Sequence, residues 1–164
     1  MRCIFMRHAQ AEDFSLTGDH DRRLTVRGRE QAVAAGELLQ PLGVTHAYVS
    51  TAARARETFE LLGLDCAVEY LPGLYNTHHD GVLEALVAAE TTPSGAALIV
   101  GHNPSMHSWA AELARLSNAT AAAAIAASFP TAALAAFHLP NTPWESFLAG
   151  NLPDEVQLEH VHLR

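Results

Sequence analysis

Residues 3–8 read CIFMRH, four apolar residues in a row followed at once by an arginine and a histidine. A run this short and this continuously apolar is typical of a β-strand that is covered on both faces, as strands in parallel sheets are. Parallel strands need crossover connections, which are usually helices. The stretch therefore predicts an α/β fold in which the arginine and the histidine stand just beyond the end of a buried strand.

Outward from this stretch, short apolar runs alternate with helical patterns, which is the signature of a layered α/β fold. We expect a single three-layer domain over residues 1–164, with a central, mostly parallel mixed β-sheet and helices on both faces. The tail should form an edge strand, and its broken alternation near His160 indicates a bulge. The expected strands are Cys3–Met6, Ala47–Ser50, Ala67–Tyr70, Ala97–Val100, Thr131–Phe137 and Val156–Leu163.

Helix signals lie between these strands. Thr25 is placed to cap a helix, and Asp80 fits the same role for a later one. Asn103 and Pro104 supply an N-cap and a first-turn proline for a third helix, whose free N–H groups would favour an anion. The alanine-rich stretch Ala119–Ala127 is compatible with either a helix or a covering loop.

Composition narrows the classes of function. The net charge of the 164 residues is −8, and all ten basic residues are arginine. Such an acidic chain predicts neither nucleic acid nor membrane as a partner. The apolar run at the N-terminus is too short for a signal segment or a membrane span, so we expect a cytoplasmic protein, most simply a monomer. Cys3 and Cys66 are expected to be free thiols.

Chemistry-bearing residues follow the ends of the predicted strands. Arg7 and His8 come after the first strand and His102 after the fourth, while Ser50 ends the second strand and Arg54 lies in the first turn of the next helix. In an open α/β sheet, ligands bind outside the carboxyl ends of the strands. Two histidines and two arginines are therefore expected to meet at one edge of the sheet.

This set of groups suits phosphoryl transfer, in which the protein mainly positions and neutralises charge on the phosphoryl oxygens. Arginine binds oxyanions through a planar fork that is always charged. A neutral imidazole is a competent nucleophile that forms a covalent intermediate. Neighbouring arginines also disfavour the imidazolium, which helps to keep His8 neutral.

Taken singly, each of these motifs has an ordinary structural explanation, but their ordered combination is specific. The combination resembles the histidine phosphatase superfamily, also called phosphoglycerate-mutase-like, and within it the short bacterial phosphohistidine phosphatases of the SixA type. The resemblance extends from Met1 to about Leu139. The motifs that carry it are MRHA at 6–9, RRLTVRG at 22–28, STAARARET at 50–58, VGHNP at 100–104 and FPTAAL at 129–134.

The resemblance implies the phosphoglycerate-mutase-like fold and a role for each matched residue. His8 would be the phosphorylated nucleophile, Arg7 and Arg54 would hold the phosphoryl oxygens, and His102 would stabilise the transferred group. Arg22 would belong to a mobile loop that binds substrate. This chain departs from the family at Arg23 and Thr51, two positions where the family commonly has proline.

The expected activity is that of a metal-independent phosphatase without a cofactor. The segment between Ser50 and Gly101 is short, which predicts an open, shallow cleft. An open cleft suits phosphohistidine on a protein, for example on a histidine phosphotransfer domain, because imidazole leaves without a strong general acid. Asp80 and His79 are the weak candidates for such an acid.

Three alternatives remain open at this point. A small-molecule phosphomonoesterase would use the same residues, and so would a module that binds phosphohistidine or phosphate without turnover. A metal enzyme would draw on the histidines at 78–79 and at 160 and 162, although adjacent arginines would repel a cation. Each alternative predicts a different result in a turnover assay.

Overall fold

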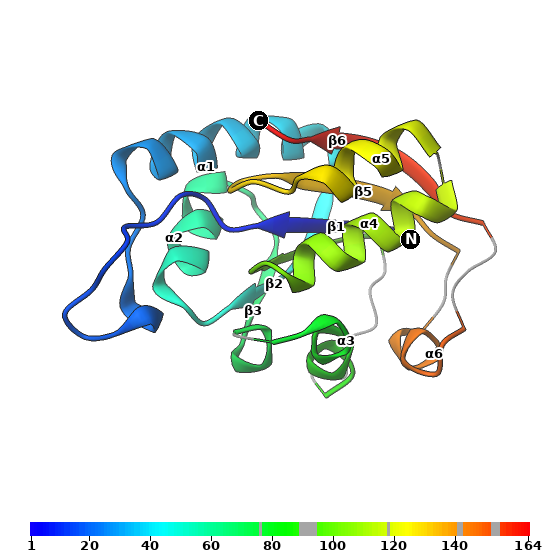
Figure 1. Cartoon of the computed structure of the whole chain (residues 1–164), viewed down its shortest axis with the longest axis horizontal. Helices are drawn as coiled ribbons and strands as arrows, with labels where there is room; N and C mark the ends of the chain where they lie inside the picture. The colour runs from blue at the N-terminus through cyan, green and yellow to red at the C-terminus, as the bar shows by residue number, and fades with distance from the viewer. Residues whose placement is uncertain (76, 89–94, 118, 141–142, 152–154) are drawn as a thin grey trace.

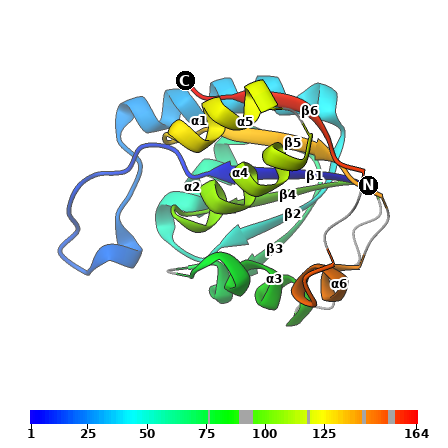
Figure 2. The same cartoon turned by 45° about the vertical axis from the view of Figure 1, so that its right-hand side comes forward.

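The sheet that the sequence predicts is present in the structure, a computed structural model that describes residues 1–75, 77–88, 95–117, 119–140, 143–151 and 155–164. Six strands are arranged in the order β3-β2-β4-β1-β5-β6, and Figure 2 lets this order be followed across the sheet. The first four are mutually parallel, whereas β5 and β6 run antiparallel to their neighbours. The strands are β1 (Arg2–Arg7), β2 (Val44–Ser50), β3 (Ala67–Leu71), β4 (Ala96–Gly101), β5 (Leu134–His138) and β6 (Gln157–His162).

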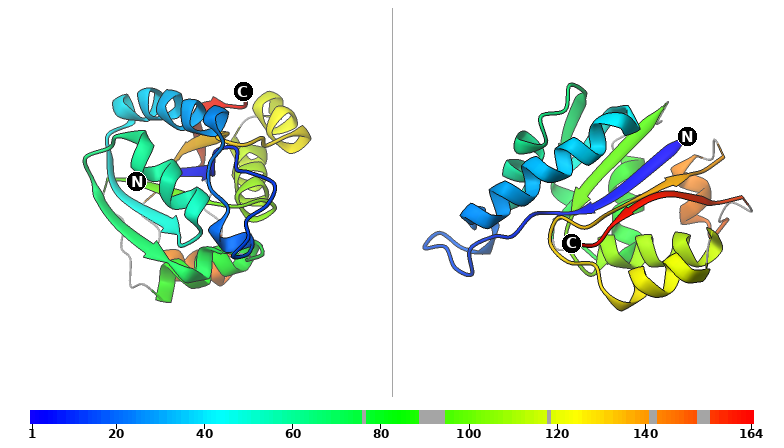
Figure 3. Two further views of the ribbon diagram at one scale, coloured as in Figure 1. Left: turned by 90° about the vertical axis from the view of Figure 1, so that its left-hand side faces the viewer. Right: turned by 90° about the horizontal axis from the view of Figure 1, so that it is seen from above.

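Helices cover both faces of this sheet, which gives the three layers. Helices α1 and α2 lie on one side and α4 with α5 on the other, as Figures 1 and 3 show. Short 3-10 segments, η1 (Asp19–Asp21), η2 (Gln40–Leu42) and η3 (Pro72–Leu74), occur in the connections. The α-helices are α1 (Val26–Leu39), α2 (Ala53–Leu62), α3 (His79–Ala88), α4 (Ser105–Ser117), α5 (Ala119–Ala127) and α6 (Trp144–Leu148).

The central strand β1 explains why its apolar run is continuous. Cys3 and Phe5 belong to the core that faces α3, α4, α5 and α6, whereas Ile4 and Met6 belong to the core under α1 and α2. Side chains alternate between the faces of a strand, so a strand that is buried on both sides needs apolar residues at every position. These four side chains are at most 1% exposed.

Several sequence predictions are confirmed. Thr25 caps α1 by accepting a hydrogen bond from the backbone N–H of Gly28. Strand β6 is an edge strand, and the register between β5 and β6 shifts by one residue next to His160, which is the expected bulge. The stretch Ala119–Ala127, whose sequence is compatible with a helix or a covering loop, is the helix α5, which packs against α4 and buries Ile125.

Other predictions are wrong in detail. Helix α4 begins at Ser105, and Asn103 does not cap it, because its side-chain oxygen Oδ1 is buried and accepts no hydrogen bond from the described residues, while its side-chain amide donates to the carbonyl of Phe129. Asp80 lies inside the first turn of α3 rather than at its cap. Strand β5 begins at Leu134, three residues later than expected, because the N–H of Ala133 closes a turn on the carbonyl of Pro130.

The parallel strands end level with one another. Arg7 of β1 pairs with Gly101 of β4, so His8 and His102 follow these strands at the same height. Ser50 ends β2 next to β4. None of the helices in the described ranges is long and apolar enough to cross a membrane.

Candidate active site

His8 is the buried centre of the site, with 7% of its surface exposed. Its backbone N–H donates to the carbonyl of Gly101 at 3.0 Å, which continues the pairing of β1 with β4 by one residue. The ring nitrogen Nδ1 lies 2.8 Å from the carbonyl oxygen of Ala9. A carbonyl can only accept, so Nδ1 carries the proton in the neutral ring and Nε2 keeps its lone pair as an acceptor. We assign this tautomer from the hydrogen-bond network.

Arg54 meets that lone pair from the first turn of α2. Its Nε lies 3.3 Å from Nε2 of His8, and its guanidinium is buried, with 6% of the side chain exposed. Thr58 ties the two elements together, because its hydroxyl donates to the carbonyl of Arg54 at 2.6 Å and accepts from the N–H of Ala9 at 3.0 Å. The fixed position of Arg54 over His8 thus comes from α2 packing directly on the end of β1.

His102 stands beside His8, with ring centroids 4.9 Å apart. Its Nε2 lies 2.8 Å from the hydroxyl of Ser50, which already accepts from the N–H of Ala52. A hydroxyl can donate or accept a second hydrogen bond, so this contact fits either tautomer; we assign the proton of His102 to Nδ1, which leaves the hydroxyl of Ser50 to donate to Nε2. That Nδ1 atom is buried and has no partner among the described residues. A buried donor without a partner is costly, and an anionic oxygen in the site would satisfy it.

Arg7 supplies a second guanidinium. One terminal nitrogen donates to the carbonyl of Phe129 at 3.1 Å, and the buried Nε has no partner in the described part of the chain. Asn103 donates to the same carbonyl. Arg7 is therefore fixed at one end while a donor remains available for a ligand.

Burial and positive charge together keep both histidines neutral. Burial lowers the pKa of His8 from 6.5 to about 4, and the charges of Arg54, Arg7 and Arg22 act in the same direction. Burial also lowers the pKa of His102, to about 3, with smaller contributions from His8 and Arg54. At neutral pH the site thus offers an unprotonated imidazole nitrogen surrounded by cationic donors.

Asp19 is a site residue that the sequence analysis missed. It lies in η1, where its carbonyl accepts from Arg54 at 2.7 Å and its carboxylate accepts from Arg54, Arg22 and the hydroxyl of Tyr75. The hydrogen bond from Tyr75 and the two guanidinium groups lower the pKa of Asp19 to about 2. The ring of Tyr75 in turn lies against His102, with centroids 5.6 Å apart.

A cavity of about 360 Å³ opens beside His8, and all five predicted site residues line it. The residues lining it are Arg7, His8, Gln10, Ala11, Asp13, Arg22, Arg54, His102, Asn103 and Thr131. The predicted set is therefore brought together in one place. Arg22 reaches it from the polar loop, where it also donates to the carbonyl of Glu12 at 2.8 Å.

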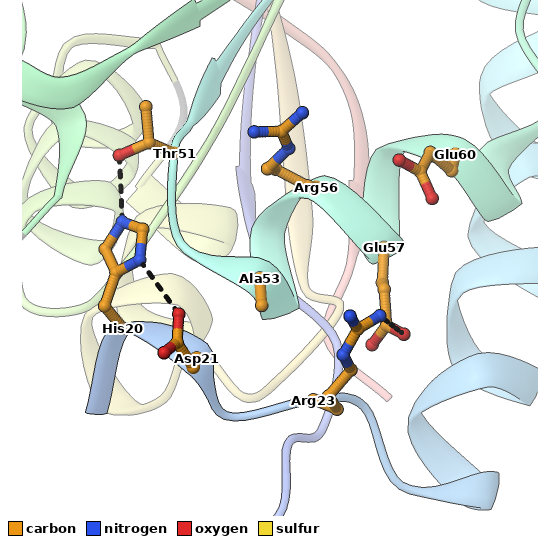
Figure 4. A pocket seen from close by; sticks show the side chains of 8 residues that line it. All are labelled: His20, Asp21, Arg23, Thr51, Ala53, Arg56, Glu57 and Glu60. Carbon is orange, nitrogen blue, oxygen red and sulfur yellow. Dashed lines mark hydrogen bonds and ion pairs between the residues drawn. The ribbon is translucent and has the colours of Figure 1, made fainter. Parts of the chain in front are cut away.

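A second hollow of about 370 Å³ lies between this loop and α2, and Figure 4 shows its lining. His20 lies between Thr51 and Asp21, and Arg23 pairs with Glu57 at 3.1 Å. The hollow is lined by both acidic and basic side chains, among them Asp21, Arg23 and Glu57. Arg23 and Thr51, at the two positions where the family commonly has proline, both line it.

The two weak candidates for a general acid lie elsewhere. The ring of His79 stacks on Trp109 at a centroid distance of 4.0 Å and pairs with Glu112, and the exposed Asp80 accepts from His79. Neither residue lines the cavity around His8. From the same stretch of chain, Tyr75 is the side chain that reaches the site.

Two further expectations concern metals and cysteines. Within the ranges that the structure covers, no three His, Cys, Asp or Glu side chains are grouped so that they could hold a metal ion. The histidine-rich stretches at 78–79 and 160–162 thus form no such group. Cys3 and Cys66 are free thiols, as predicted.

Comparison with known proteins gives concordant results. The family model of the histidine phosphatase superfamily (branch 1) matches residues 3–91. An uncharacterised protein of Mycobacterium tuberculosis is 38% identical over 136 residues, which span 79% of this chain and 84% of that protein. Among solved structures, the proposed phosphohistidine phosphatase SixA of Nakamurella multipartitia superposes with a TM-score of 0.82 at 32% identity, covering 98% of this chain and 94% of that one. The protein histidine phosphatase SixA in complex with tungstate has a TM-score of 0.70 at 23% identity, covering 98% and 96%.

Proposed function

Because this chain belongs to the histidine phosphatase superfamily, we propose that it is a phosphohistidine phosphatase that removes the phosphoryl group from a histidine side chain of another protein through a covalent phospho-His8 intermediate. The comparisons support phosphatase activity in general, and the observation that carries the finer proposal is the orientation of His8. Its Nδ1–H donates to the carbonyl of Ala9, so that Nε2 presents its lone pair beside Nε of Arg54.

In the first step, Nε2 of His8 attacks phosphorus, and the bond between phosphorus and the imidazole of the substrate breaks. The departing imidazole keeps the bonding electron pair and takes a proton from solvent. Arg54 and Arg7 neutralise the phosphoryl oxygens, and Nδ1–H of His102 supplies a further donor. In the second step, the oxygen of water attacks the phosphorus and the bond between phosphorus and Nε2 breaks, with its electron pair staying on Nε2. The water oxygen leaves as part of the phosphate, and its protons go to the phosphate and to solvent.

The substrate class follows from the leaving group. An alkyl phosphate must expel a poor alkoxide, which normally requires a positioned acid. Asp80 and His79 lie outside the cavity, and the pKa of Asp19, about 2, leaves that carboxyl without a proton at neutral pH. Imidazole is a far better leaving group than an alkoxide, so a P–N bond suits this site better than an alkyl ester.

The covalent step is tested by rapid quenching with a phosphorus-labelled phosphohistidine protein. Label on the enzyme should survive alkali and be lost in acid, as a phosphoramidate requires, and His8→Ala should carry none. His138→Ala is the matched control, because His138 is exposed at the end of β5. Normal turnover by His8→Ala would refute the mechanism.

The same assay separates the remaining alternatives. We expect activity to survive prolonged EDTA, because arginines supply the positive charge that a metal ion gives in other phosphatases. Vanadate should inhibit as a mimic of five-coordinate phosphorus. Binding of phosphate without turnover would indicate a binding module, and faster turnover of an alkyl phosphate would indicate a phosphomonoesterase.

A further inference from the structure

The loop between β1 and α1 exposes large apolar side chains beside the active site. Phe14 is 69% exposed and Leu16 is 94% exposed. With Val26, at 77%, they are the three most exposed large hydrophobic residues of the described chain, and all lie within thirteen positions of one another. We refer to residues 12–23 as the rim loop. Figure 1 shows it projecting beyond the end of the sheet.

The rim loop is a built structure and not a loose connection. Its base is closed by a bridge between Ala11 and Leu24 and by the N–H of Glu12 donating to the carbonyl of Arg23 at 2.8 Å. Its outer part carries a turn of its own, in which the hydroxyl of Ser15 accepts from the N–H of Thr17. Phe14 and Leu16 are therefore held in the open by a hydrogen-bonded backbone.

The returning limb of the rim loop is part of the phosphoryl site. Asp19 binds Arg54, Arg22 lines the cavity, and Asp13 lines it from the outgoing limb. His8 is 7% exposed and lies at the base of this cavity. Because both limbs of the rim loop line this cavity, a macromolecule that delivers a phosphoryl group to His8 would come close to the outer residues of the loop.

We infer that Phe14 and Leu16 form the docking contact for the phosphohistidine-bearing protein, an inference that rests on the proposed function. The partner surface next to its phosphohistidine should be apolar and bordered by lysine or arginine. The apolar part would cover Phe14 and Leu16, and the basic part would face the exposed carboxylates of Glu12, Asp13 and Asp21.

Charge argues for this occupant against two others. A second copy of this chain, with net charge −8, would bring its own acidic surface against the loop carboxylates. An anionic membrane would be repelled for the same reason. The exposed apolar side chains and the loop carboxylates together favour a partner protein whose apolar surface is bordered by basic residues.

The test compares two substrates with the same leaving group. One is a histidine phosphotransfer domain phosphorylated in vitro, and the other is free phosphohistidine. The double variant Phe14→Ser, Leu16→Ser should lower kcat/KM for the protein by about tenfold to a hundredfold, as expected for loss of two central apolar contacts. Turnover of free phosphohistidine should be unchanged, because neither residue lines the cavity.

Leu148→Ser is the matched control, since Leu148 is an exposed leucine, 39% accessible, on α6 at the other end of the molecule from the rim loop. An equal decrease of kcat/KM for both substrates in the double variant, or no decrease for the protein substrate, would overturn the docking contact. Either result would leave the proposed function standing. The docking contact would also be overturned if the wild-type protein formed a dimer and the double variant did not. The same holds if the wild-type protein bound anionic vesicles and the double variant did not. If the wild-type enzyme turned over neither phosphohistidine substrate, the proposed function itself would fail.

Discussion

The guanidinium of Arg54 is shared between His8 and Asp19. Its Nε faces Nε2 of His8 at 3.3 Å, while the two terminal nitrogens donate to the carbonyl and the carboxylate of Asp19 at 2.7 and 3.1 Å. Asp19 thus fixes the orientation of the guanidinium group of Arg54, so that its Nε points at Nε2 of His8. A phosphoryl group arriving at His8 would meet a donor that is already oriented.

This arrangement predicts unequal effects of two substitutions. Arg54→Ala should lower kcat about 100- to 1000-fold, the usual result of losing one preorganised donor. Asp19→Asn should lower kcat less than about tenfold, because its side chain is 54% exposed and solvent screens the lost charge. Steady-state kinetics with a phosphohistidine protein measure both. A larger loss for Asp19→Asn than for Arg54→Ala would contradict the assignment of Asp19 as a positioning residue.

The titration of His8 gives a second prediction. Burial, with the charges of the arginines, lowers its pKa from 6.5 to about 4, so the nucleophilic form is complete above about pH 5 and is lost as the pH falls through 4. Replacing the positive Arg7 by a neutral residue, as in Arg7→Gln, should raise the pKa of His8. Nitrogen-15 NMR of the imidazole measures this pKa and also shows which ring nitrogen carries the proton. A proton on Nε2 in the neutral ring would contradict the proposed nucleophile.

A third prediction concerns Asp13, a carboxylate that lines the cavity. If imidazole leaves without a general acid, Asp13→Asn should leave kcat for a phosphohistidine protein within about twofold of wild type, well below the 10²–10⁴-fold that a catalytic acid contributes. An aryl phosphate serves as the comparison substrate, since it also has a good leaving group. A large loss of kcat with phosphohistidine would identify Asp13 as the acid and refute the leaving-group argument.

The packing of α1 gives the fourth prediction. A Cβ on Gly28 would lie 1.9 Å from the carbonyl oxygen of Gln10, so Gly28→Ala must displace backbone next to the cavity. On a free helix the same change would stabilise by roughly 0.5–1 kcal/mol. Here the free energy of unfolding should instead fall by about 1–3 kcal/mol, the cost of overpacking. Urea unfolding measures it, with Ala34→Ser on the exposed side of α1 as control. A gain in stability would show that α1 can shift away from Gln10.

Much of this site was predictable because its residues follow strand ends. The apolar runs before His8 and His102 indicate strands buried on both faces, and parallel strands ending at one edge bring their next residues together. That argument uses local patterns alone, and the structure agrees with it for Arg7, His8, Arg54 and His102.

Non-local contacts account for what the sequence analysis missed. Asp19 is one of several acidic residues in a polar loop, and its neighbours Arg54 and Tyr75 are 35 and 56 positions away. Asn103 matches a helix cap locally, yet its amide donates to the carbonyl of Phe129, 26 positions on, and its Oδ1 accepts from none of the described residues. The alanines of α5 have no strong periodicity, so the sequence does not indicate a buried face. The helix is recognised only from the structure, in which Ile125 is buried against α4.

The spacing of the two histidines has a consequence for how such a protein can change over evolutionary time. Their ring centroids are 4.9 Å apart. Both residues directly follow the paired ends of β1 and β4, so the backbone ladder of these two strands keeps them side by side and no loop has to do so. Insertions or deletions in the rim loop can alter which molecule is accepted while the nucleophile and its neighbour keep their separation.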